Sequence, residues 1–342
     1  MLQQTPRDIL RPVYHWAIRR HRLRQVELYR DPRSPELVEL FSTLLRAPEP
    51  VFVCRIGGSD YELARDRCND RHAFEAPERF SWALEQARSL PGYFDFDSRY
   101  ETFDRYLAWL TDCYRRADCL TYAGEYLIGR FRVNGFERRD VKMLNHVCRG
   151  KKLIDYTFIE ALSPFLRSFS SWGEDRRILV VSPLSRSVEH QSRRLDDLIL
   201  GYRFPSFELL TFTSPVTYST ASDSALTLNV ATRNWHEETE RMANEIAGLE
   251  FDVALLSCGS YATALGDFVR HELGKKAVYL GGMLNVMFNI YGERYDTPFF
   301  DSLVNLDTRI DALENDELAS VRGGRGLRNE AMRAYFGRAP RR

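Results

Sequence analysis

The sequence of 342 residues lacks the features that would place it among membrane, secreted or disulfide-stabilised proteins. It has no run of about 18 apolar residues, so no membrane-spanning helix is expected. Its N-terminus has no long apolar segment, so we expect no signal peptide. The six cysteines are scattered and form no CxxC pair, which favours a reduced, cytoplasmic setting.

Several motifs that identify common enzyme classes are missing as well. No GxGxxG opens a helix and no GxxxxGK[ST] occurs, so neither a standard dinucleotide fold nor a P-loop enzyme is supported. HExxH and GxSxG are absent, and the seven histidines show no metal-ligand spacing. His190, His236 and His271 fall on predicted helices, where a solvated or half-buried imidazole is the simpler interpretation.

The charge balance argues against nucleic acid as a partner. Lys and Arg number 48 and Asp and Glu number 48, so the formal net charge is zero. The two ends are nevertheless basic, with seven Arg in residues 1–30 and seven in 322–342. They could contact an anionic inner-membrane surface from the cytoplasmic side. The alternative is that the first helix is solvated and its aromatic residues dock on the domain.

Residues 250–296 read as a strand, turn, helix, strand and second turn. The apolar runs 251–257 and 277–280 are typical of buried strands, and helical spacing between them ends at Gly274. This is one right-handed crossover of an α/β sheet. Its turns leave the carboxyl ends of strands, where open α/β sheets bind ligands.

Further apolar runs at 51–55 and 177–182 predict additional strands of the same kind. Four loops at strand ends follow from the pattern: Gly57–Glu62, Ser182–Ser187, Ser257–Tyr261 and Gly281–Asn285. A long polar loop over 213–227 has the length of a functional lid.

The first of these loops carries two acids, Asp60 and Glu62. Hard carboxylates at a strand end could hold Mg2+ or Mn2+ on a diphosphate. The alternative, which the spacing alone favours, is that Asp60 caps the following helix and Glu62 lies in its first turn. Ser185 and Arg186 likewise either hold an anion at a helix start or belong to an ordinary serine cap.

We therefore predict a Rossmann-like α/β fold with a mostly parallel sheet flanked by helices. Residues 1–50 are expected to form a helical extension, 51–310 the α/β domain, and 311–342 a basic tail. An apolar stripe at Leu37, Leu40, Phe41, Leu44 and Leu45 marks a helix in the extension.

Four segments make the chain resemble a bacterial family related to the GT-D glycosyltransferases. They are RIGGSDYE at 55–62, ILVVSPLSRSVEHQ at 178–191, DVALLSCGSYATALGDFV at 252–269 and KKAVYLGGMLNVMFNIYGERYD at 275–296. The family's metal motif follows a strand end as RFGDGE. Placed without a gap, it sets Gly58 at the first acid, whereas a shift of two residues yields Asp60 and Glu62.

The resemblance implies a GT-D-like fold and an enzyme that transfers a sugar from a nucleotide sugar to a glycan, lipid-linked or protein acceptor in surface-polysaccharide or glycoconjugate biosynthesis. It implies Mn2+ or Mg2+ on Asp60 and Glu62, which are also the expected catalytic residues. A general base is not identified, with Glu62 and Asp223 as guesses. The residues expected to bind the donor are Arg55, Gly57, Gly58, Ser185, Arg186, Gly259, Ser260, Tyr261, Gly281 and Gly282. Because the first acid is displaced, a non-catalytic nucleotide- or glycan-binding or scaffold protein is the alternative.

Overall fold

A computed structural model describes residues 27–29, 34–89, 92–123, 138–154, 158–217, 219–220, 224–225, 230–292 and 295–314. The strands are β1 (Glu27–Tyr29), β2 (Phe52–Gly57), β3 (Cys119–Ala123), β4 (Lys152–Ile154), β5 (Arg176–Ser182), β6 (Phe207–Thr213), β7 (Ser219–Thr220), β8 (Ser224–Ala225), β9 (Val253–Leu256) and β10 (Lys276–Tyr279). The α-helices are α2 (Pro35–Arg46), α3 (Gly58–Asn69), α4 (Pro77–Ser89), α5 (Tyr100–Arg116), α7 (Arg138–Val147), α8 (Phe158–Trp172), α9 (Ser185–Ser192), α10 (Trp235–Ala247), α11 (Tyr261–His271), α12 (Met283–Met287) and α13 (Pro298–Asp301). Two 3-10 turns, Leu195–Asp197 and Leu306–Thr308, complete the described elements.

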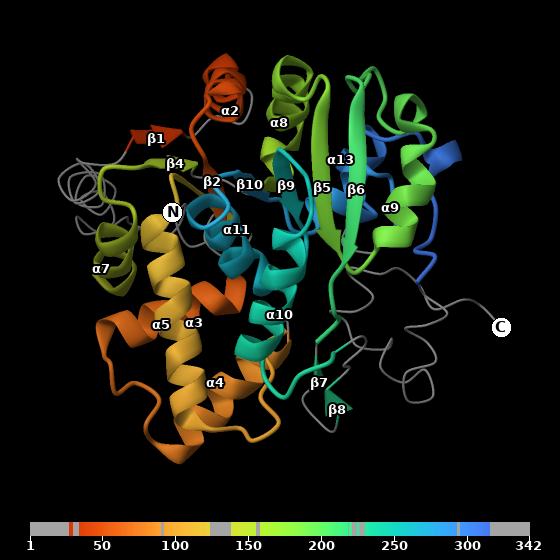
Figure 1. The fold of residues 1–342 in the computed structure, drawn as a ribbon. Coiled ribbons are helices and arrows are strands. Elements are labelled where there is room, and N and C mark those ends of the chain that lie inside the picture. The colour runs from red at the N-terminus through yellow and green to blue at the C-terminus, as the bar shows by residue number, and fades with distance from the viewer. Residues whose placement is uncertain are drawn as a thin grey trace, which may run out of the picture.

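Eight strands form one sheet in the order β1-β4-β3-β2-β10-β9-β5-β6. Every pairing in it is parallel. The predicted α/β class with a parallel sheet flanked by helices is therefore confirmed (Figure 1). The central strand β9 is apolar and buried along its whole length, as expected where helices cover both faces of a sheet.

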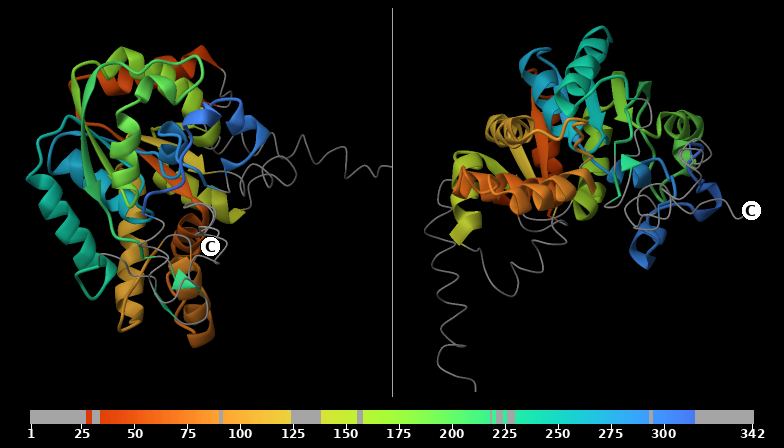
Figure 2. Two further views of the ribbon diagram at one scale, coloured as in Figure 1. Left: turned by 90° about the vertical axis from the view of Figure 1, so that its right-hand side faces the viewer. Right: turned by 90° about the horizontal axis from the view of Figure 1, so that it is seen from below.

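Alternate residues of each strand enter two separate cores. On β2, Val53 packs into a core shared with α2, α8, α9 and α12. Its neighbours Phe52 and Cys54 point into the opposite core, shared with α3, α4, α5, α7, α10 and α11. Seen from below, α10 and α11 lie on one side of the strands and the blue C-terminal elements on the other (Figure 2).

The strand order explains which helix covers which face. Crossover connections between parallel strands are right-handed. A connection that runs one way across the sheet therefore lies on one face, and a connection that runs the other way lies on the opposite face. The chain leaves β2 and β9 for helices of one face, α3 and α11, and leaves β10 and β5 for helices of the other face, α12 and α9. β2 adjoins β10 and β9 adjoins β5, so at both places neighbouring strands lead to helices on opposite faces of the sheet. In open α/β sheets, ligands bind at such switch points, in the crevice outside the carboxyl ends of the strands.

The predicted boundary at residue 50 does not separate the N-terminal residues from the domain. Residues 27–29 are a strand rather than a helix, and they pair with β4 at the edge of the sheet. The predicted helix is present as α2, but it packs on α8, with the rings of Phe41 and Phe165 edge to face at 5.6 Å. Its apolar stripe is buried in the core of the sheet, so α2 is part of the α/β domain.

Other local differences are small. The predicted polar loop over 213–227 contains an antiparallel pair, β7 with β8, and its Asp223 lies outside the described residues. α9 ends at Ser192, and the 3-10 turn Leu195–Asp197 follows it. The first basic helix and residues 315–342 of the basic tail also lie outside the described residues. Within the described ranges, no helix combines the length and apolar character needed to cross a bilayer.

Candidate functional site at the carboxyl edge of the sheet

The four predicted loops lie at one edge of the sheet, on four neighbouring strands. They follow β2, β10, β9 and β5, which are adjacent in that order. All strands are parallel, so their carboxyl ends meet at the same edge. Helices α3, α4 and α5 extend below the arrowheads of β5 and β6 in Figure 1 and flank this edge.

The junction of β2 and α3 is tighter than the predicted loop. β2 ends at Gly57 and α3 begins at Gly58, with no residue between them. Gly58 has a φ of +47°, a conformation that costs little for glycine and strains other residues. The sharp reversal places Asp60 in the first turn of α3, so Asp60 is not the N-cap.

Asp60 is buried and hydrogen-bonded to a tyrosine from another helix. Tyr106 of α5 donates its hydroxyl to Asp60 Oδ1 at 2.5 Å. Burial raises the pKa of Asp60 from 3.8 to about 7, and the Tyr106 hydrogen bond opposes part of that rise. Asp60 can therefore exchange a proton near neutral pH, as a general acid or base must.

Glu62 does not join Asp60 as a second ligand on one side of the helix. The two residues are two positions apart within α3, and such positions point to different sides of a helix. Among the residues that the structure describes, no group of three or more His, Cys, Asp or Glu side chains is arranged to hold a metal ion. The described residues thus do not fit the two-carboxylate metal site that the sequence suggested.

The turn after β9 approaches Asp60 through Trp235 and Tyr106. Ser260 is fully buried and accepts a hydrogen bond from Trp235 Nε1 at 2.8 Å, and the Trp235 ring lies 4.8 Å from the ring of Tyr106. Tyr261 is 1 % exposed, its ring stacks on Trp235 at 5.7 Å, and its hydroxyl donates to Thr217. The structure therefore brings the predicted residues Asp60 and Ser260 together, while Tyr261 has the packing of a core residue.

The carboxyl end of β2 carries a cation. Arg55 of β2 lies over the ring of Tyr279, with its guanidinium carbon 5.9 Å from the ring centroid. Gly281 has a φ of +59°, and a Cβ at this position would overlap the Arg55 guanidinium. Within the described part of the chain, Arg55 forms no ion pair, so its charge is not neutralised by a carboxylate there.

The turn after β5 is occupied by the chain itself. Ser187 donates its backbone N–H to Glu314 Oε1 at 3.1 Å and its hydroxyl to Glu314 Oε2. Arg186 donates to the carbonyl of Leu313 at 2.8 Å, and Ser185 shares a hydrogen bond of 2.6 Å with Thr213. The helix start predicted to bind an anion thus binds the carboxylate of Glu314.

The predicted site residues therefore lie at the carboxyl edge of the sheet, on elements of both faces. Gly58, Asp60, Gly259, Ser260 and Tyr261 belong to or lead into α3 and α11. Ser185, Arg186, Gly281 and Gly282 belong to or lead into α9 and α12. Arg55 and Gly57 belong to β2, and the Arg55 guanidinium lies at Gly281 and Tyr279.

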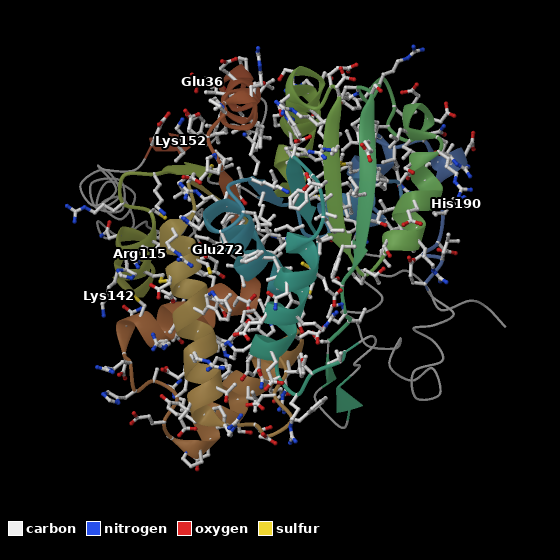
Figure 3. The ribbon with its side chains drawn as sticks, in the orientation of Figure 1. Glu36, Arg115, Lys142, Lys152, His190 and Glu272 are labelled. Atoms are coloured by element: carbon white, nitrogen blue, oxygen red, sulfur yellow. The ribbon has the colours of Figure 1, made fainter. Side chains whose placement is uncertain are left out.

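The sequence did not reveal Tyr106, Trp235 and Glu314. Tyr106 and Asp60 are 46 residues apart, and Glu314 and Ser187 are 127 apart, so no local pattern links them. Tyr106 lies on the buried face of α5, a position that gives no sign of a link to Asp60. Among the described histidines, His190 lies at the outer margin of α9, where it hydrogen-bonds Arg194 at 3.0 Å (Figure 3).

Comparison with known proteins yields a similarity in outline only. No family model and no curated protein matches the sequence. Two solved chains of a domain of unknown function, number 1792, superpose on the structure; one is selenomethionine-substituted, and the other is described as having a distinct glycosyltransferase fold. Both have a TM-score of 0.43 and 14 % identity, cover 79 % and 78 % of this chain, and are themselves covered over 82 % of their length. At this level the likeness by itself decides neither family nor function.

Proposed function

We propose that the protein transfers a sugar from a nucleoside-diphosphate sugar to a hydroxyl group of a glycan, lipid-linked or protein acceptor. The observation that carries the proposal is that the end of β2 and the start of α3 bring a cation and a neutral-range carboxyl group to the same edge of the sheet. Arg55 supplies the cation and Asp60 the carboxyl group. A transfer of this kind needs both, because a diphosphate departs and a hydroxyl proton must be taken up.

Arg55 has the chemistry to hold the diphosphate. A guanidinium group presents several donors in a planar fork that matches phosphate oxygens. The Arg55 guanidinium lies against the Gly281 backbone, and a side chain at position 281 would overlap it. The diphosphate would therefore lie at the carboxyl ends of β2 and β10, next to the switch point.

Asp60 has the chemistry to accept the proton. In its ionised form it takes the proton of the acceptor hydroxyl while that oxygen forms a bond to the anomeric carbon of the donor. The bond between the anomeric carbon and the diphosphate oxygen breaks, and the nucleoside diphosphate leaves with the electron pair. Arg55 stabilises the negative charge that develops on the leaving group.

The divalent ion expected from the family resemblance has no part in these steps. Asp60 and Glu62 do not form a pair on one side of α3, so no residue set for the ion can be assigned. Dependence on Mn2+ or Mg2+ is therefore tested directly by running each assay with the ion and with a chelator.

Release of nucleoside diphosphate tests the proposed reaction. The full chain is incubated with UDP-, GDP- and CDP-sugars and an acceptor mixture, and the diphosphate released is measured against pH. We expect release with at least one donor, increasing as pH rises through about 7, and a loss of 100-fold or more in Asp60→Asn. Absence of release with every donor, with or without Mn2+, would reject the proposal.

The alternative is a protein of the same pathway that binds nucleotides or glycans without turnover. The separation of Asp60 and Glu62 favours it, since a two-carboxylate metal site is lost. It predicts binding of a nucleotide sugar without release of diphosphate, and full function in cells of an Asp60→Ala variant. Contact of the basic ends with an anionic membrane remains a prediction, tested by co-sedimentation with anionic vesicles of the full chain and of a chain lacking residues 1–30.

A further inference from the structure

We propose that His236 is a pH-sensitive contact between α10 and α5. The neutral imidazole joins the two helices, and uptake of a proton by the ring separates them. The proposal goes beyond the transfer reaction and does not depend on it, because it uses none of the residues assigned to that reaction.

The imidazole of His236 joins the first turns of two helices. His236 is the second residue of α10, and it is only 2 % exposed. Its Nε2 lies 3.0 Å from the carbonyl oxygen of Thr102, which belongs to the first turn of α5. A carbonyl oxygen can only accept a hydrogen bond, so Nε2 carries the proton and donates it. This hydrogen bond therefore fixes which nitrogen is protonated in the neutral ring.

The other ring nitrogen, Nδ1, is closed to a second proton. It is shielded from solvent and has no hydrogen-bond partner among the described residues. In the neutral ring Nδ1 is an acceptor, whereas in the protonated ring it would be an N–H donor. Protonation would thus bury both a charge and a donor that lacks an acceptor, and each of these costs free energy.

Two tryptophan rings enclose the imidazole. Trp109 of α5 stacks on it with centroids 5.5 Å apart and an interplanar angle of 13°, and Trp235 meets it edge to face at 5.2 Å. A protonated imidazole would be attracted to the face of Trp109. That attraction offsets only part of the cost of protonation, because Nδ1 would still have no acceptor.

The charged groups around the ring do not compensate for its burial. Arg105 of α5 and Asp95 act on it from the neighbouring segments, and the like charge of Arg105 opposes protonation. Both carboxylate oxygens of Asp95 already accept backbone N–H groups of the following turn, at 3.0 and 3.2 Å. Glu240, one turn further along α10, is exposed. Burial therefore prevails and lowers the pKa of His236 from 6.5 to about 4.

The sign of the pH effect follows from these two values. Between about pH 6.5 and pH 4 the unfolded chain binds a proton that the folded protein does not bind, so stability falls as pH falls through this range. An imidazole that takes up the proton must leave Thr102 and Trp109, which frees the start of α10 from α5. The preceding residue, Trp235, donates to Ser260 at 2.8 Å, so the separation reaches the turn after β9 at the carboxyl edge of the sheet.

His236→Gln removes the titration and can keep the contact. The glutamine amide can donate to the Thr102 carbonyl and takes up no proton in this range. Urea unfolding of the full chain at pH 7 and pH 4.5 gives the unfolding equilibrium constant of each protein. Between these values the constant should rise about 50-fold more in the wild type than in His236→Gln. His146→Gln, which replaces an exposed imidazole on α7, is the control and should follow the wild type.

Hydrogen exchange shows where the acid effect acts. At pH 4.5 the amides in the first turn of α10 should exchange faster in the wild type than in His236→Gln, and at pH 7 the two proteins should agree. Equal pH dependence of unfolding in the two proteins, or equal exchange at pH 4.5, overturns the proposal.

If His236→Gln does not fold, NMR of the histidine-labelled wild type decides the outcome. The His236 signal is identified by the contact of its ring with Trp109. An imidazole that stays neutral, with its proton on Nε2, to below pH 5 supports the proposal. An imidazole that titrates near pH 6.5 while the protein stays folded overturns it.

Discussion

At Asp60, burial moves the proton-binding range of a carboxyl group toward neutral pH. Its pKa rises from 3.8 to about 7 because the charged form is poorly solvated in the fold. Between these values the folded protein holds a proton that the unfolded chain has released. The contribution of this group to the free energy of unfolding therefore falls as pH rises from about 4 to about 7, and stays low above that range.

Asp60→Asn should remove that pH dependence. We expect the stability of the wild type, relative to Asp60→Asn, to fall by about 2–3 kcal/mol between pH 5 and pH 8. Urea unfolding of both proteins at a series of pH values measures it. Asp112→Asn, which changes an exposed carboxylate on α5, serves as control and should follow the wild type at every pH. A constant difference between wild type and Asp60→Asn would show that Asp60 ionises in the folded protein as it does in the unfolded chain.

The two acids illustrate what the sequence could and could not predict at the residue scale. Their position after a strand and a glycine pair was sufficient to place Asp60 at the carboxyl edge of the sheet. Whether it faced solvent, a metal or the core depended on Tyr106, which lies in another helix. The helix boundary decided where Glu62 points. Because α3 begins at Gly58, Asp60 and Glu62 are two positions apart in a helix rather than in a loop.

At the scale of elements, the apolar runs predicted the central strands because a parallel sheet buries both faces of each strand. A local side-chain contact also starts α10: the side chain of its N-cap, Asn234, accepts from the Glu237 N–H at 3.1 Å. Helix packing against the sheet was not predictable, since it depends on side chains far apart in the chain. Gly266 of α11 is an example, because its missing side chain admits the ring of Phe52 from β2.

Gly266→Ala should destabilise the protein by about 1–3 kcal/mol. The new Cβ would overlap the ring of Phe52, which is fully buried and has little room to shift. Gly248→Ala is the control, because the nearest atom to its Cβ is a carbonyl oxygen at 3.4 Å. Urea unfolding should show a lower midpoint for Gly266→Ala and little change for Gly248→Ala. Equal midpoints would mean that α11 can move away from β2 at little cost.

Glu314 anchors the segment after the last 3-10 turn to the start of α9. Glu314→Gln keeps the size of the side chain and removes its charge at the positive end of the helix. We expect a loss of about 1–3 kcal/mol and faster hydrogen exchange at the first amides of α9, because the Ser187 N–H and hydroxyl lose a charged acceptor. Leu313→Ala, which shortens an exposed side chain, should change neither quantity. Unaltered exchange in Glu314→Gln would show that the charge of Glu314 does not hold α9.

For the whole molecule, the sheet class and the common edge of the four loops followed from the sequence because strand ends and glycine turns are local signals. The strand order did not, since pairing between β2 and β10 joins segments more than 200 residues apart. That order sends the chain to α3 and α11 on one face and to α9 and α12 on the other. Asp60, at the start of α3, and Arg55, near the end of β2, thereby lie at the same edge of the sheet.

The central claim is that a nucleoside diphosphate binds in this crevice against Arg55. A crystal of the full chain soaked with UDP, with and without Mn2+, shows directly where the diphosphate lies. Calorimetry then measures the affinity of Arg55→Ala and of Arg177→Ala for UDP. Arg177→Ala is the control, because Arg177 lies at the amino ends of the strands, paired with Glu250 and Asp252. The account predicts diphosphate density between Arg55 and the Gly281 backbone, and binding at least 10-fold weaker in Arg55→Ala alone. Diphosphate bound elsewhere on the molecule, or equal affinity in both variants, would contradict it.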